Sequence, residues 1–302
     1  MVKILKNILN KLPYVRGLYA QAKRYNENAF FPPGHFYSSV TNLKEIKQRE
    51  DQIWRGVEVD YIKGLDLRTE AQIELLTRLS DYYSELPFPK DKNTTFRYYF
   101  ENPYYLYTDG IILYGLMRYL KPKRIIEVGS GFSSALMLDV NEHYFGNSIN
   151  FMFIEPFPNR LNGILRKEDI NVSKIVERKV QDVDIEIFKQ LKAGDILFID
   201  STHVSKCGSD VNFLLFEVLP VLNKDVYIHF HDVFYPFEYP KEWVFKGYNW
   251  NENYILRSFL MYNKAFQIEI FADYLHKHHK SVFSKMPLAF KNTGGNLWIK
   301  KV

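Results

Sequence analysis

The sequence predicts a doubly wound α/β fold with a mostly parallel sheet of seven strands, preceded by a helical and aromatic extension. Three observations support this prediction. After residue 121, short β-rich runs alternate with helical stretches, as in βαβ units. A turn with two glycines, at 129–131, follows the first of these runs. The chain before residue 105 instead contains helical stretches and aromatic loops, so we expect two parts, 1–104 and 105–302.

Residues 1–12 carry leucines and isoleucines at helical spacing, interrupted by lysines, and predict a basic amphipathic helix that ends at Pro13. Such a helix either lies on a membrane surface or packs against its own domain or a partner subunit, and its periodicity does not separate these alternatives. The other elements expected in the first part are a loop at 30–40, helical structure at 42–85, an aromatic loop at 86–108 and a helix at 109–120.

Seven runs are expected to be strands: 124–128, 150–155, 174–180, 195–200, 225–231, 266–271 and 296–300. Helical stretches are expected between the first five, at 133–141, 158–165, 184–191 and 209–219. An NTGG turn before the last strand predicts that the final two strands form an antiparallel end of the sheet. Ligands of such sheets bind beyond the carboxyl ends of the strands. Four acids lie at these ends and are expected to carry the chemistry: Glu127, Glu155, Asp200 and Asp232.

Charge and composition restrict the functional classes. The formal net charge is +5, but residues 1–24 hold six basic and no acidic side chains, so the rest of the chain is close to neutral. A nucleic-acid-binding domain would show a basic face, so we do not expect nucleic acid as a partner. The single cysteine, Cys207, excludes an intrachain disulfide and favours a reducing, cytoplasmic compartment. No apolar run approaches the roughly 18 residues that span a bilayer, so any membrane contact is expected to be peripheral, through residues 1–24.

The glycine turn predicts a nucleotide-bearing ligand, because Gly129 and Gly131 allow a sharp bend and close approach of the ligand to the backbone. Ser134 occupies the position of the third glycine of a dinucleotide fingerprint. Glu127 is expected to point into the cleft, where a carboxylate would repel a pyrophosphate but suit an ammonium group. Glu155 ends the next strand, where an acid commonly binds both ribose hydroxyls. S-adenosylmethionine has a cationic amino-acid tail and a ribose but no phosphate, and satisfies both conditions.

Three segments, in this order, resemble the motifs of class I S-adenosylmethionine-dependent methyltransferases: EVGSG (127–131), FIEP (153–156) and VQDV (180–183). The resemblance covers about residues 105–302 and implies a Rossmann-like methyltransferase fold. It also implies that the first segment holds the methionine part, the second acid holds the ribose, and the third segment borders the adenine. The cofactor-binding residues expected on this basis are Glu127, Gly129, Ser130, Gly131, Ser134, Glu155, Gln181, Asp182 and Asp200.

A second group of residues predicts a metal-assisted reaction. Asp200 and Asp232 end neighbouring parallel strands, which lie about 4.8 Å apart, so both carboxylates can reach one cation. Oxygen ligands of this kind suit magnesium. His203 follows Asp200 by three residues and could take a proton from a hydroxyl nucleophile, an effect of roughly 10²–10⁴-fold in rate. The simpler alternatives are that His203 caps a loop and that Asp200 caps the following element.

The same residues resemble the metal-dependent sugar O-methyltransferases that act on macrolides. Their pattern is an Asp, a His three residues later, and an acidic pair that ends the next strand. Asp200, His203 and Asp232 match this pattern, whereas His231 replaces the first acid of the pair. This departure leaves the metal open between magnesium and a softer ion such as manganese, iron or zinc. His231 is either a metal ligand or a hydrogen-bond partner of one, and His229 is expected to pack in the sheet.

We therefore expect O-methylation of a hydroxyl on a sugar, a glycan precursor or a similar small molecule, in a bacterial enzyme. Three rival classes stay open: a nicotinamide-dependent oxidoreductase, disfavoured by Glu127; a non-haem iron oxygenase that uses His203, His231 and Asp232; and a non-catalytic scaffold. A homo-oligomer also stays open. The aromatic residues after Asp232 suit either a substrate lid or packing against the N-terminal segment: Tyr235, Phe237, Tyr239, Trp243 and Trp250.

Overall fold

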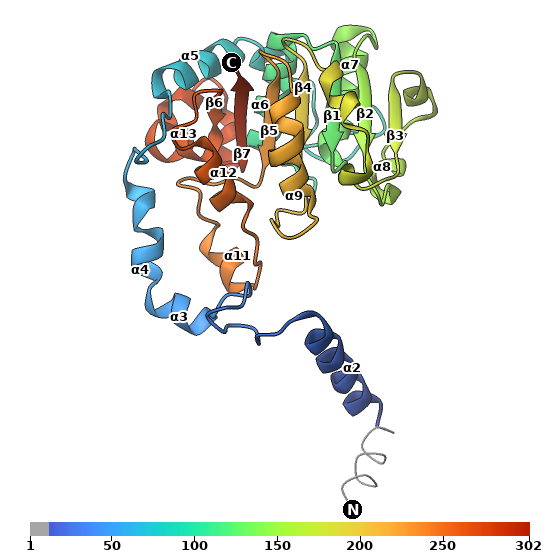
Figure 1. Ribbon diagram of the computed structural model, residues 1–302. Coiled ribbons are helices and arrows are strands. Elements are labelled where there is room, and N and C mark those ends of the chain that lie inside the picture. The colour runs from blue at the N-terminus through green and yellow to red at the C-terminus, as the bar shows by residue number, and fades with distance from the viewer. Residues whose placement is uncertain (1–11) are drawn as a thin grey trace, which may run out of the picture. The chain divides into compact units, whose positions relative to one another are not determined.

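The computed structural model describes residues 12–302 (Figure 1). Their contacts form two compact units: residues 12–53 with Glu242–Asn249, and Trp54–Lys241 with Trp250–Val302. The division falls after Ile53 rather than at 104, because side chains between 62 and 107 pack in the same core as the sheet. The basic helix expected over 1–12 lies outside the described residues except for Leu12. Every described helix is too short or too polar to cross a membrane.

The first unit contains α2 (Pro13–Asn28), α3 (Leu43–Gln48), α4 (Glu50–Ile53) and most of α11 (Lys241–Phe245). Pro13 is the first residue of α2, whereas the helix that was expected to end at this proline lies outside the described residues. Proline is tolerated there because the N–H that it lacks would have no partner within the helix. The two segments of this unit are joined by a hydrogen bond of 2.8 Å from the Thr41 amide to Asn249 Oδ1.

The second unit is built on a seven-stranded sheet in the order β3-β2-β1-β4-β5-β7-β6. Strands β1 to β5 are parallel, and β7 is antiparallel to both β5 and β6, which confirms the predicted antiparallel end. All four residues of β4 are buried, as expected of a parallel strand that is covered on both faces. The strands are β1 (Arg124–Val128), β2 (Asn150–Ile154), β3 (Ser173–Val176), β4 (Ile196–Ile199), β5 (Tyr227–His231), β6 (Phe266–Phe271) and β7 (Asn296–Lys301).

Helices flank this sheet on both faces, which confirms the doubly wound α/β prediction (Figure 1). Helix α6 packs between α5 and α7, and its residues 107–117 are therefore buried. The longer helices are α5 (Thr69–Ser80), α6 (Tyr107–Leu120), α7 (Phe132–Phe145), α12 (Glu252–Leu260) and α13 (Ala272–His278). The shorter ones are α8 (Asn159–Asn162), α9 (Asp210–Phe213) and α10 (Leu219–Val221), with a π-helical turn at Leu214–Val218.

Short 3₁₀ segments fill several connections: Trp54–Glu58, Tyr83–Glu85, Lys167–Asn171, Val180–Asp182, Ile185–Gln190, Lys280–Phe283 and Pro287–Lys291. The helix expected over 184–191 is one of these. The helical structure expected over 42–85 is interrupted, because α4 passes into a 3₁₀ segment and α5 begins only at Thr69. Helices α12 and α13 were not expected from the sequence.

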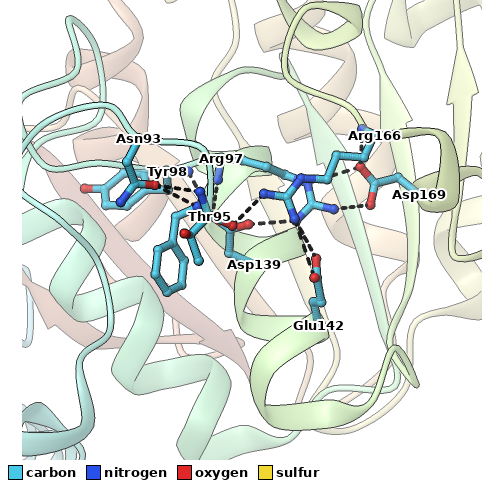
Figure 2. Close-up of polar contacts among 9 residues, drawn as sticks. Asn93, Thr95, Arg97, Tyr98, Asp139, Glu142, Arg166 and Asp169 are labelled. Carbon is cyan, nitrogen blue, oxygen red and sulfur yellow. Dashed lines mark hydrogen bonds and ion pairs between the residues drawn. The ribbon is translucent and has the colours of Figure 1, made fainter.

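Arg97 fastens the loop that precedes α6 (Figure 2). Its guanidinium lies 2.7 Å from Asp139, 2.8 Å from Glu142 and 2.6 Å from Asp169, and its side chain is 3% exposed. Asp139 Oδ2 also accepts hydrogen bonds of 2.8 Å from the amides of Arg97 and Tyr98. The loop is thereby tied to α7 and to the 3₁₀ segment at Lys167–Asn171. This matters for the site, because the same loop continues to Tyr105, whose ring centroid lies 5.3 Å from that of His231.

Candidate active site

The glycine turn and the end of β4 are in direct contact. Gly129 has a φ of +79°, and a β-carbon built at this position would lie 1.9 Å from the carbonyl oxygen of Asp200. Glycine is therefore required here both by the backbone conformation and by the lack of space. The Asp200 amide donates to the Val128 carbonyl at 2.9 Å, so the turn after β1 and the residue after β4 hold each other in place.

Glu127 lies beneath the turn rather than in an open cleft. Its carboxylate is fully buried, accepts a hydrogen bond of 2.6 Å from the Ser133 hydroxyl, and is bonded to the Ser134 hydroxyl. Burial raises the pKa of Glu127 to about 8, against the opposing effect of these serines. Ser134 Oγ also accepts a bond of 3.0 Å from the Gly131 amide. The expectation that Glu127 points into the cleft is thus wrong, because the first turn of α7 folds two hydroxyls over it.

A cavity of about 400 Å³ opens beyond the carboxyl ends of β1, β2 and β4, a size and position typical of a small-molecule site. Glu155 lies in its wall, and its two oxygens accept hydrogen bonds from the amides of Ser130, at 3.2 Å, and Phe157, at 2.8 Å. Four of the expected cofactor residues line the cavity: Gly129, Glu155, Gln181 and Asp200. Ser130, Gly131 and Ser134 instead shape the turn, and Asp182 is exposed and does not line the cavity.

The expected metal ligands come together at the ends of β4 and β5. Ile199 and Phe230 are paired in the sheet, so the residues that follow them, Asp200 and His231, are neighbours. Donor atoms of Asp200, His231 and Asp232 all lie within 4.8 Å of one another. His231 Nδ1 is 3.7 Å from Asp200 Oδ1 and 3.4 Å from Asp232 Oδ1. Two carboxylates and one imidazole nitrogen are a donor set suited to a divalent cation.

Mutual attraction shifts the pKa values of this cluster. Burial lowers the pKa of His231, but the negative charges of Asp232 and Asp200 outweigh it and raise that pKa well above its usual range. Burial raises the pKa of Asp200, but His231 and His203 outweigh it and hold that pKa well below its usual range. The cluster therefore carries paired charges without a cation, and a cation that binds here would have to displace the proton of His231.

His203 is turned toward the same cluster. Its Nε2 lies 3.4 Å from Asp200 Oδ1 and 3.4 Å from Asp232 Oδ2, and its side chain is 6% exposed. Its other ring nitrogen, Nδ1, lies 2.8 Å from Glu252 Oε2. Burial lowers the pKa of His203, but hydrogen bonds to Asp200 and Glu252 outweigh it and raise the pKa to about 10.

The comparisons with known proteins agree with this geometry. Residues 126–233 match a family model described as a methyltransferase domain, and this range contains the turn, the cavity strands and the carboxylate cluster. The chain therefore contains a class I S-adenosylmethionine-dependent methyltransferase domain. An uncharacterized protein from Archaeoglobus fulgidus is 34% identical to the methyltransferase over 170 residues, which are 55% of this chain and 76% of the relative.

Solved structures that the chain matches include an S-adenosylhomocysteine-bound methyltransferase from Podospora anserina. It is 14% identical, with a TM-score of 0.41, and the match covers 78% of this chain and 94% of that chain. A structure of CmcI with magnesium and S-adenosylmethionine is also 14% identical, with a TM-score of 0.41, and covers 74% of this chain and 84% of that chain.

Glu252 is the residue of the methyltransferase site that sequence reasoning missed. It lies 49 residues after His203, at the start of α12, and is 2% exposed. The helical spacing of Ile255, Leu256 and Phe259 could have identified α12, with the acid in its first turn. Nothing in the local sequence indicates that this acid is buried against a histidine.

His229 packs as expected, with its ring centroid 3.8 Å from that of Phe198 and its side chain fully buried.

The alternative that His203 caps a loop holds only for its backbone, since its carbonyl accepts hydrogen bonds from the amides of Asn251 and Glu252. Asp200 does not cap the next helix, because Ser209 is the N-cap of α9. Among the described residues, the three donors that converge within 4.8 Å include Asp200 in place of the His203 of the oxygenase set, although His203 Nε2 also lies 3.4 Å from Asp232 Oδ2.

Of the two alternatives for the aromatic residues after Asp232, the substrate lid does not hold for three of them. Tyr235, Phe237 and Tyr239 are between 1% and 2% exposed, so they belong to the interior. The Tyr235 hydroxyl donates to the Val59 carbonyl, and Trp54 Nε1 donates to the Tyr239 carbonyl at 2.9 Å. These contacts correspond to the alternative of packing against an N-terminal segment. Trp250 is the exception, with its ring centroid 4.4 Å from that of His203.

Proposed function

We propose that this methyltransferase moves the methyl group of S-adenosylmethionine to a hydroxyl oxygen of a sugar, a glycan precursor or a similar small molecule, with a divalent cation at Asp200, His231 and Asp232. One observation carries the proposal. Asp200 both lines the cavity beyond β1, β2 and β4 and belongs to the carboxylate cluster. A methyl donor in the cavity would therefore lie next to the cation site, as a transfer between neighbouring groups requires.

The residues present fit a cation. Three donor side chains converge, and His231 Nδ1 faces the carboxylates while its Nε2 is buried without a protein partner in the described part of the chain. Magnesium suits the oxygen donors, and the imidazole nitrogen favours manganese or another transition metal. When bound, the cation would lower the pKa of an acceptor hydroxyl and orient its oxygen.

The chain's own residues would then share the remaining work. Glu155 would hold the ribose hydroxyls, Gln181 would border the adenine, and the turn at Gly129 would let the donor approach the backbone. Glu127 would act through the turn that it stabilises rather than by direct contact with the amino group. His203 Nε2 would accept the hydroxyl proton in the unprotonated form of the ring, and a cation that offsets the charge of Asp200 and Asp232, which Nε2 faces, would favour that form.

The methyl donor, the acceptor hydroxyl and His203 are sufficient to balance the atoms, charge and electrons of the proposed reaction. The bond between methyl and sulfur breaks as the bond between methyl and oxygen forms, and the electron pair returns to the sulfur. The proton leaves the hydroxyl for His203. The positive charge of the sulfonium is thereby transferred to the imidazole, so positioning and deprotonation are the main contributions that the protein must supply.

For partners, we propose a small molecule or glycan rather than nucleic acid. The net charge of +5 less the six basic residues of 1–24 leaves −1 for the remainder, a balance that does not favour nucleic-acid binding. Residues 1–24 are proposed as a peripheral membrane contact. Flotation with anionic liposomes tests this: a variant that lacks residues 1–24 should lose liposome binding, and equal flotation of both proteins would remove the proposal.

The reaction is tested with purified full-length protein, S-adenosylmethionine and a panel of sugars, with Mg²⁺ or Mn²⁺ or with a chelator. The expected result is formation of S-adenosylhomocysteine that requires both a hydroxyl acceptor and the cation. His203→Ala should retain S-adenosylmethionine binding and lose turnover. Unchanged turnover in His203→Ala would remove His203 from the role of base, and turnover in the presence of chelator would remove the cation.

A further inference from the structure

We propose that Glu252 is a positioning residue, which holds the His203 ring with Nε2 directed at Asp200 and Asp232. The inference rests on the proposed function, because it assigns Glu252 a part in presenting the base. Glu252 is neither in the lining of the cavity beyond β1, β2 and β4 nor among the three donors of the carboxylate cluster, so it would act on the reaction through other residues, above all His203.

The hydrogen bonds of Glu252 define the orientation of the ring. A carboxylate oxygen only accepts, so the 2.8 Å contact between Glu252 Oε2 and His203 requires a proton on Nδ1. Nε2 is then the ring nitrogen that faces the cluster. The second oxygen, Oε1, accepts a bond of 3.2 Å from the Ser201 hydroxyl, so the carboxylate is itself held from two sides.

Hydrogen bonds join the loop that carries His203 to the start of α12, which carries Glu252. The amides of Asn251 and Glu252 donate to the His203 carbonyl at 3.0 Å and 3.2 Å. Asn251 also accepts from the Ser205 amide at 2.6 Å and donates to the Ser205 carbonyl at 3.1 Å. His203 has a φ of +60°, a conformation that residues with a β-carbon hold only where the surrounding structure imposes it. The start of α12 is thus a fixed support for the loop that carries His203.

A purely structural role for Glu252 does not account for this arrangement. An acid in the first turn of a helix is stabilising through the helix dipole even when exposed. Burying a carboxylate is costly unless a close partner compensates it. Glu252 is 2% exposed, and its shortest side-chain hydrogen bond is to the ring nitrogen of His203, whose ring also packs against Trp250. Its burial is therefore best explained by the ring that it orients.

Proton NMR of the metal-free full-length protein gives a readout that needs no acceptor. A ring N–H that donates to a buried carboxylate resonates far downfield of the amides, and His203→Gln assigns the signal by removing it. We expect this resonance in the wild type, its loss in Glu252→Ala, and an upfield shift in Glu252→Gln, whose neutral oxygen is a weaker acceptor. Glu70→Ala, which removes an exposed acid from the first turn of α5, is the matched control and should leave the resonance unchanged.

Turnover and binding complete the test. With any sugar that the wild type methylates, Glu252→Ala should lose roughly 10–100-fold in kcat with little change in KM for S-adenosylmethionine, and Glu252→Gln should recover much of the loss. A downfield Nδ1 proton resonance, distinguished from the Nε2 proton by ¹⁵N-histidine labelling, that survives in Glu252→Ala or is missing from the wild type would overturn the positioning role, as would wild-type kcat in Glu252→Ala. Calorimetry of the wild type with S-adenosylmethionine separates the two proposals: absence of binding would end the proposed function, while the NMR result would still decide how the ring is held.

Discussion

Gly129 and Asp200 are so close that a β-carbon at position 129 would lie 1.9 Å from the Asp200 carbonyl oxygen. One contact therefore couples the glycine turn to the residue shared by the cavity and the carboxylate cluster. Any displacement at 129 has to move the main chain of Asp200. The cavity expected to bind the cofactor and the cluster expected to bind the cation are therefore linked through the backbone even without ligands.

Gly129→Ala should therefore disturb both sites. It combines a positive φ with a clash against the backbone, which we expect to destabilise the fold by about 2–4 kcal/mol and to abolish S-adenosylmethionine binding. Urea unfolding and calorimetry measure the two effects. Gly146→Ala is the matched control, since Gly146 also has a positive φ but a β-carbon there would meet no atom within 4 Å. Its cost should be about 1 kcal/mol, with binding intact; equal behaviour of the two variants would contradict the account.

Asp200→Asn should weaken divalent cation binding. The change removes one charged donor from the cluster with His231 and Asp232, and we expect Mn²⁺ affinity to fall by about 10–100-fold. Electron paramagnetic resonance of free Mn²⁺ during a titration gives the affinity directly. Asp182→Asn changes an exposed acid that does not line the cavity, and should leave the titration unaltered. The cation site would be refuted by identical Mn²⁺ curves for wild type and Asp200→Asn.

Arg97→Met should destabilise the second unit strongly. The substitution leaves Asp139 and Asp169 buried without their cation, a loss of about 3–5 kcal/mol. Arg78→Met breaks an exposed pair with Glu74 and should leave the free energy of unfolding close to the wild-type value. Denaturant unfolding of both variants makes the comparison. If the two losses were similar, the Arg97 cluster could not be what fastens the loop before α6.

Glu127 should make stability fall as the pH rises. Its pKa is about 8 in the folded protein and near the ordinary value of 4.5 when unfolded. Between these values the folded state retains a proton that the unfolded state has lost, so this group stabilises the fold most at low pH and less as the pH passes toward 8. Glu127→Gln should flatten that part of the dependence. The check is the unfolding midpoint of both proteins from about pH 5 to pH 8, and parallel curves would show that Glu127 does not titrate in this window.

The sequence predicted contacts that depend on strand order, but it did not predict contacts between segments that are far apart in the chain. Asp200, His231 and Asp232 were predicted together because strand ends in a parallel sheet meet at one edge, a consequence of strand order alone. The pairing of Glu252 with His203 was not predicted, because it joins segments 49 residues apart through the placement of α12. No pattern of residue types indicates such a contact.

The direction of individual side chains was the second feature that the sequence did not predict. The sequence places Glu127 at the end of β1, but whether its side chain faces the cavity or the helix depends on Ser133 and Ser134, whose hydroxyls close over it. Burial of the aromatic residues after Asp232 likewise depends on contacts with Trp54 and Val59, which lie far away in the sequence. Element types could therefore be inferred from periodicity, whereas the direction of individual side chains could not.

The central claim is that S-adenosylmethionine occupies the cavity beside Asp200 with its ribose on Glu155. Calorimetric titration of the full-length protein with S-adenosylmethionine tests this most directly, with Glu155→Ala measured alongside. The account predicts saturable binding to the wild type, weakened by about 10–100-fold in Glu155→Ala through loss of charged hydrogen bonds. Absence of binding to the wild type, or equal affinity in Glu155→Ala, would contradict it.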